Sequence, residues 1–156
     1  MVITMHSTDF GGLSDEALIT WLTAHDRRPN LMIVAHGLPV DDVADRFMIV
    51  CDQPFRRSLL PGRLNLPASR RGIVLLENVT ALSLPQQIVL NDWISEGRGE
   101  AQIVSIAATP LWRLVEDGDF LEGLFYRLNV VHLDASAESL IAAAVQSDEH
   151  RESPWA

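Results

Sequence analysis

Apolar residues occur along this chain as short runs separated by segments with helical spacing. Five mostly apolar runs predict buried strands, at residues 31–35, 48–51, 73–76, 103–107 and 129–133. The segments between them predict helices at 40–47, 54–60, 84–96, 111–115 and 120–126. A further helix is expected after Ser14 as N-cap, and another at 136–145. Strands alternating with helices predict an α/β domain with a mostly parallel sheet.

The helix expected at 84–96 has the clearest boundaries. Pro85 lies in its first turn, where proline is tolerated, and Gly97 follows its last residue. A chain of 156 residues fits one domain with its own core. We expect a single α/β domain over residues 1–146 and a flexible C-terminal tail over 147–156.

Composition narrows the classes of function. Hydrophobic residues make up 47% of the chain, as in ordinary globular proteins, and the formal net charge is −9. Such an acidic chain argues against a nucleic-acid partner, because phosphate contacts need a basic surface. No apolar run is long enough to predict a membrane span, and Cys51 is the single cysteine. We therefore expect a cytoplasmic protein without nucleic-acid or membrane partners.

Several blocks in the second half resemble one family. Residues 72–79, G-I-V-L-L-E-N-V, are similar to the Walker B strand of sigma-54-dependent activators, roughly G-T-L-F-L-D-E-I. Residues 106–109, I-A-A-T, resemble that family's sensor strand I-A-A-T-N, and residues 124–131 are close to its L-Y-Y-R-L-N-V-V. The blocks keep their order and nearly their spacing. The resemblance implies a three-layer, P-loop NTPase-like AAA+ core with five strands in the order 5-1-4-3-2.

The segment at the family's P-loop position departs from the motif. A P-loop surrounds phosphates with backbone N–H groups from a glycine-rich turn and neutralises them with a lysine. Here Gly37 is the one glycine left and Val40 stands about where the lysine belongs. Asp41 and Asp42 add negative charge at the helix start that should receive phosphate. His36 beside these acids is a weak metal pattern, so we expect a solvated turn and no metal site.

The Walker B and sensor positions are also altered. The family's metal-holding Asp aligns with Glu77 and its catalytic Glu with Asn78, which cannot serve as a general base. Thr109 keeps the sensor position, although proline follows it. Arg127 matches one of two arginines that the family directs into a neighbouring subunit's ATP site. Two interpretations of Arg127 stay open: a residue carried along with its packing motif, or one that faces a subunit interface.

These departures predict a protein without catalytic residues, cofactor or ATPase activity. The chain also lacks the family's G-A-F-T-G-A sigma-contacting loop between residues 62 and 72, and we expect no helical lid. The sequence thus predicts a pseudo-ATPase that acts as a regulatory, protein-binding module in transcription control, with an AAA+ sigma-54 activator as the expected partner. Two alternatives remain: a residual nucleotide sensor or ATPase that uses Glu77 and Thr109, and a homo-oligomeric scaffold.

Overall fold

The structure is a computed structural model that describes residues 3–4, 28–51, 54–69, 71–97 and 100–135. The helices expected after Ser14 and at 136–145, and the tail at 147–156, lie outside the described residues. The proposed division into a 1–146 domain and a tail therefore stays a prediction. Within the described ranges, no helix is long and apolar enough to cross a membrane.

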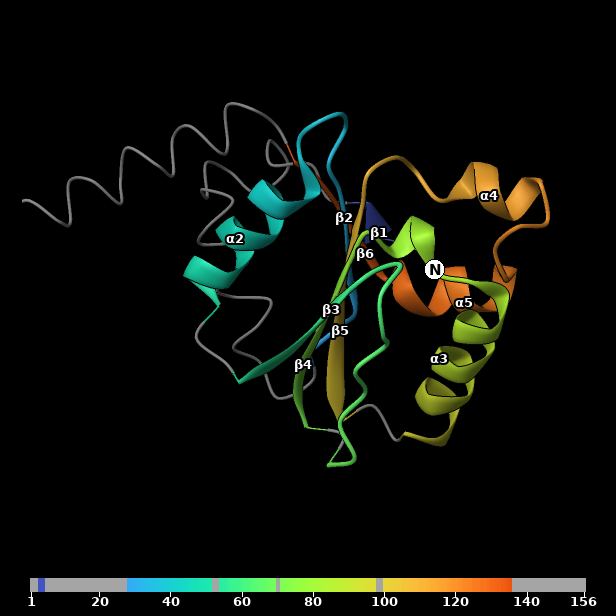
Figure 1. Cartoon of the computed structure of the whole chain (residues 1–156), viewed down its shortest axis with the longest axis horizontal. Helices are drawn as coiled ribbons and strands as arrows, with labels where there is room; N and C mark the ends of the chain where they lie inside the picture. The colour runs from blue at the N-terminus through green and yellow to red at the C-terminus, as the bar shows by residue number, and fades with distance from the viewer. Residues whose placement is uncertain (1–2, 5–27, 52–53, 70, 98–99, 136–156) are drawn as a thin grey trace, which may run out of the picture.

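A parallel sheet forms the centre of the molecule (Figure 1). Its strands are β1 (Ile3–Thr4), β2 (Leu31–Val34), β3 (Phe55–Leu59), β4 (Gly72–Glu77), β5 (Ala101–Ala107) and β6 (Val131–Asp134). They lie in the order β1-β6-β2-β5-β4-β3, and every neighbouring pair is parallel. Counted without the two-residue β1, this order is the expected 5-1-4-3-2. The predicted fold class is confirmed, with β1 as an additional strand beside β6.

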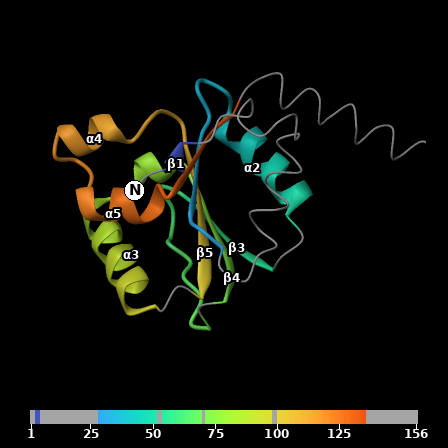
Figure 2. The same cartoon turned by 180° about the vertical axis from the view of Figure 1, so that it is seen from behind.

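Helices cover both faces of the sheet, which gives three layers (Figures 1 and 2). One face carries α2 (Val40–Val50), and the other carries α3 (Leu84–Glu96), α4 (Trp112–Glu116), α5 (Glu122–Leu128) and the short 3₁₀ helix η2 (Val79–Ala81). Alternate residues of β4 point to opposite faces, so Ile73 and Leu75 pack on the α2 side while Val74 and Leu76 pack on the α3 side. Two apolar cores result, one on each side of the sheet.

Helix α3 has the predicted bounds. Ser83 forms a capping box with Gln86: the Ser83 hydroxyl accepts from the Gln86 backbone N–H at 3.3 Å, and the Gln86 side chain accepts from the Ser83 N–H at 3.1 Å. At the other end, the Gly97 N–H donates to the Trp93 carbonyl oxygen at 3.1 Å. Local sequence alone sets both ends of this helix.

The second strand was assigned to the wrong residues. Residues 48–51 were expected to be a strand and 54–60 a helix, but α2 continues to Val50 and residues 55–59 form β3. The apolar run at 47–50 follows the helical turn: Phe47 is buried in the core, whereas Ile49 is 67% exposed. β3 reads as polar because it lies at the edge of the sheet, where most side chains meet solvent.

Candidate functional site at the carboxyl edge of the sheet

The parallel strands bring most of the predicted site residues to one edge. Gly37 and Val40 follow β2, Glu77 and Asn78 lie at the end of β4, and Thr109 follows β5. In open α/β sheets, ligands bind outside the carboxyl ends of the strands. The structure thus gathers residues that are far apart in the sequence at the edge where this fold class places its sites.

The turn after β2 closes on itself. The Leu38 N–H donates to the Ala35 carbonyl oxygen at 3.0 Å, and the two residues between them, His36 and Gly37, have φ values of 48° and 85°. Two positive φ angles are the mark of a type I′ turn. The Leu38 N–H, which a phosphate-binding loop would direct toward its ligand, is used inside the turn.

The first turn of α2 disfavours the binding of an anion such as phosphate. Pro39 precedes the helix and has no N–H to offer, and Asp41 and Asp42 are both exposed in the first turn. Val40, at the position of the family's lysine, is partly buried and packs against the core on the α2 side. This helix start carries negative charge where the helix dipole would favour an anion.

A side-chain cluster that the sequence did not predict fixes the turn to β6. Asp134, the last residue of β6, accepts hydrogen bonds from Nε2 of His36 at 2.5 Å and from Nε2 of His132 at 2.8 Å. Burial raises the pKa of the Asp134 carboxyl, but the hydrogen bonds and charges of the two histidines outweigh it and leave the pKa below its usual value. His36 is therefore a contact between the β2–α2 turn and β6.

The carboxylate of Glu77, at the Walker B position, forms an ion pair with an arginine. Glu77 is fully buried, and both of its carboxylate oxygens accept from the guanidinium of Arg57 on β3, one of them from Nη2 at 2.8 Å. The hydrogen bond with Glu77 raises the pKa of Arg57; burial opposes this, and the charges of Glu77, Asp45 and Asp41 add to it. A buried carboxylate needs such a bidentate partner.

Arg57 was missed because residues 54–60 were assigned to a helix. In the parallel register Arg57 pairs with Leu75, two residues before Glu77, so both side chains lie on the α2 side of the sheet. A buried acid at the end of one strand is itself a signal to search the neighbouring strand for a cation.

Asn78 adopts a backbone conformation that explains its residue type. Its φ and ψ are 62° and 52°, in the left-handed region that asparagine tolerates better than most residues. Its side chain accepts from the Thr80 hydroxyl at 3.0 Å and donates to the Leu60 carbonyl oxygen at 3.4 Å. Asn78 thus shapes the turn that leaves β4.

Thr109 lies at the carboxyl edge without a hydrogen bond to the described residues there, and Arg127 lies elsewhere. Thr109 is exposed and makes no hydrogen bond with the described part of the chain. Arg127 lies at the opposite edge, where its backbone carbonyl accepts from the Asn30 side chain at 2.8 Å and its guanidinium donates to the Ser95 hydroxyl on α3. The described ranges contain no group of three or more His, Cys, Asp or Glu residues able to hold a metal ion.

The strand order and the helices on both faces of the sheet define the fold class, which is a three-layer, P-loop NTPase-like α/β fold (Figure 1). Two similar solved structures are NtrX from Brucella abortus in complex with ATP and in complex with ADP. They share 18% and 19% identity with this chain, cover 81% and 75% of it, and have TM-scores of 0.56 and 0.53. The P-loop NTPase domain of the sigma-54 transport activator from E. coli aligns over 75% of this chain and 96% of that one, at 14% identity and a TM-score of 0.49.

The likeness to NtrX shows the fold alone: the chain has a three-layer α/β core similar to part of NtrX. It spans about a third of the NtrX chains that it matches, since 36% and 33% of those chains are covered. No family model matches the sequence, and no curated protein matches it.

Proposed function

We propose that this chain is a non-catalytic AAA+-like module that regulates a sigma-54-type activator, or a related AAA+ protein, by binding to it. The observation that carries the proposal is the Arg57–Glu77 pair. A metal-bound nucleotide in the family's manner needs the Walker B carboxylate, and here that carboxylate is buried and already held by two hydrogen bonds. Displacing Arg57 would leave its charge without this partner and expose the metal to a competing cation.

The turn after β2 supports the same proposal. Its geometry is fixed by the Leu38–Ala35 hydrogen bond and by the contact of His36 with Asp134. To wrap around a triphosphate, the turn would have to break both. No lysine follows it, and two aspartates stand at the helix start. A nucleotide would meet repulsion there instead of a cradle.

The partner is proposed from the resemblance to sigma-54-dependent activators. AAA+-type cores present surfaces that pack against one another, and a fold alone does not fix which neighbour is bound. Arg127 is the residue of this surface that the family resemblance singles out, and it is exposed on α5. We place the regulated partner in transcription control on the basis of the sigma-54-activator resemblance.

Mixing the chain with a sigma-54 activator encoded beside it, and measuring the partner's ATPase rate and complex formation, tests the proposal. A complex and a changed rate are expected, and Arg127→Ala should weaken the complex. Arg113→Ala, which removes an exposed arginine from α4, is the matched control. Absence of both a complex and a rate change contradicts the proposed function.

A homo-oligomeric scaffold is the second candidate, because α3 exposes a strip of large apolar side chains. Leu84, Ile88 and Val89 are each about half exposed. Such a strip is typical of a surface that packs against another molecule. Light scattering tests this: a particle mass above that of the monomer, reduced by Ile88→Glu, favours the scaffold, and a monomer at high concentration excludes it.

A further inference from the structure

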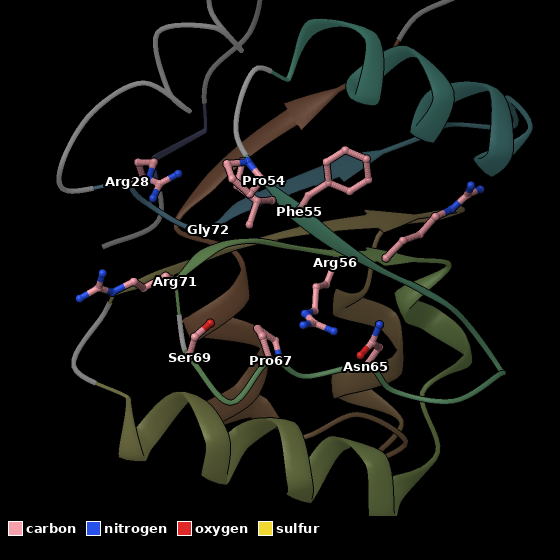
Figure 3. Close-up of a pocket in the computed structure, with 11 residues that line it drawn as sticks. Arg28, Pro54, Phe55, Arg56, Asn65, Pro67, Ser69, Arg71 and Gly72 are labelled. Atoms are coloured by element: carbon pink, nitrogen blue, oxygen red, sulfur yellow. The ribbon is translucent and has the colours of Figure 1, made fainter.

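An arginine-lined hollow lies at the outer edge of the sheet and shares Arg57 with the site described above. Its volume is about 880 Å³, and its walls come from the segment before β2, from β3, from the loop after β3 and from the start of β4. Figure 3 shows Arg28 and Arg71 on one side and Arg56 pointing toward the loop that carries Asn65 and Pro67. Four arginines line the hollow: Arg57 is held by Glu77, and the other three come from separate segments of the chain.

These three arginines lack acidic partners in the described part of the chain. None of Arg28, Arg56 and Arg71 forms an ion pair there, and no carboxylate is among the described residues that line the hollow. Nη1 of Arg28 is buried and has no hydrogen-bond partner among the described residues. In a chain with 21 acidic and 12 basic residues, a basic surface without local acids is unexpected. Guanidinium groups favour carboxylates and phosphates because they donate in a planar fork.

The edge strand beside the hollow also offers backbone groups. The Ile73 N–H donates to Pro54 and the Leu60 N–H donates to Glu77, so residues 54, 56, 58 and 60 direct their backbone groups to β4. The backbone groups of Phe55 and Arg57, and the N–H of Leu59, consequently point outward. β3 is the last strand of the sheet and pairs with β4 alone among the described residues. An open edge of this kind accepts an added strand.

We propose that β3 and the hollow form a docking site for an extended acidic segment of a partner protein. The segment adds to β3 through the outward backbone groups, and its carboxylates pair with Arg56, Arg71 and Arg28. A peptide fits both features, whereas a small phosphorylated ligand uses the arginines alone. The overall charge of −9 disfavours a nucleic acid. This site goes beyond the proposed function: it uses the backbone groups of Arg57, but neither the Arg57–Glu77 ion pair nor Arg127.

Four probes test the proposal by fluorescence anisotropy and competition. They are a blocked peptide of about ten residues that alternates Glu and Val, the same length of alternating Glu and Pro, alternating Gln and Val, and inorganic tripolyphosphate. The Glu–Val peptide should bind at least roughly tenfold more tightly than either other peptide. The Glu–Pro peptide keeps the charge, but it lacks the N–H of every second residue and its prolines fix φ near about −65°, away from an extended strand. The Gln–Val peptide keeps the backbone but lacks the charge.

Variants separate the two features of the site. Arg56→Glu and Arg71→Glu should each weaken binding of the Glu–Val peptide roughly tenfold, while Arg113→Glu, which makes the same charge change on α4, should change it less than about twofold. Phe55→Pro removes an outward N–H at the first residue of an edge strand, a position that tolerates proline, and should bind more weakly than Phe55→Ala. Thermal melting of each variant checks that the fold is retained.

Three results would overturn the proposal. The first is equal binding of the Glu–Pro and Glu–Val peptides, or displacement of the latter by equimolar tripolyphosphate, since either indicates a simple anion site. The second is an equal loss of binding in Arg56→Glu and Arg113→Glu, which indicates a bulk charge effect. The third is absence of Glu–Val binding to the folded wild-type chain.

Discussion

The helical layer of α3, α4 and α5 and the carboxyl edge of the sheet differ in what they keep from the AAA+ pattern. The layer contains the block at residues 124–131 that resembles the sigma-54-dependent activators, and its contacts are local or buried. For example, the Gln87 side chain donates to the Leu82 and Asp119 carbonyl oxygens and accepts from the Leu121 N–H. At the carboxyl edge the strands keep their places, but Glu77 and His36 are engaged in contacts within the chain. The packing of a fold is thus separable from the chemistry of its site.

The largest expected effect comes from Arg57→Ala, which leaves the fully buried Glu77 unpaired. Breaking a buried pair from one side costs about 3–5 kcal/mol, which we reduce to roughly 2–3 kcal/mol because Arg57 is partly exposed. Urea unfolding measures the loss. Arg56→Ala, next in sequence and exposed, is the control and should change stability by less than about 0.5 kcal/mol. Similar losses of stability in both variants would show that the Arg57–Glu77 ion pair does not stabilise the edge of the sheet.

A second variant examines the helical layer. Gln87→Ala removes three hydrogen bonds and leaves buried backbone groups without partners, so a loss of about 2 kcal/mol is expected. Ile88→Ala, on the exposed side of the same helix, should cost less than about 0.5 kcal/mol. If the two variants were equally stable, the layer would depend on apolar packing and not on this buried amide.

The sequence predicted the helical layer better than the carboxyl edge. Ser83, Pro85 and Gly97 mark α3 because capping is a local property, and the strand at 73–76 was correctly placed within β4. The prediction of where α2 ends and β3 begins was wrong, because an apolar helix end and a central strand look alike in sequence. The contacts His36–Asp134 and Arg57–Glu77 join residues from different strands or turns, and spacing along the chain carries no signal for them.

The Asp134 cluster predicts a pH dependence. Because the folded pKa of Asp134 lies below its ordinary value of 3.8, the carboxylate stabilises the fold above that value, and this contribution is lost as pH falls through the folded pKa. Asp134→Asn should cost about 1 kcal/mol near neutral pH, and the difference from the wild type should shrink below about pH 4. Urea unfolding of both proteins across this range measures it. If the stability difference between the two proteins stayed constant with pH, the Asp134 carboxylate would not be the source of the pH dependence.

The smallest effect is expected at Thr109. Its side chain is exposed and makes no hydrogen bond within the described ranges, so Thr109→Ala should change stability by less than about 0.5 kcal/mol. The same variant should leave regulation of the partner unchanged, as measured by the partner's ATPase rate. A clear loss of regulation would favour the nucleotide-sensor alternative, in which Thr109 takes part.

Calorimetric titration with ATP and Mg²⁺ tests most directly the claim that contacts within the chain have replaced the nucleotide site. The account predicts no heat of binding at micromolar or millimolar nucleotide for the wild type, and none for Val40→Lys, because a lysine alone does not open the turn after β2 or release Glu77. Saturable binding of Mg·ATP to the wild-type chain, lost in Glu77→Gln, would contradict it.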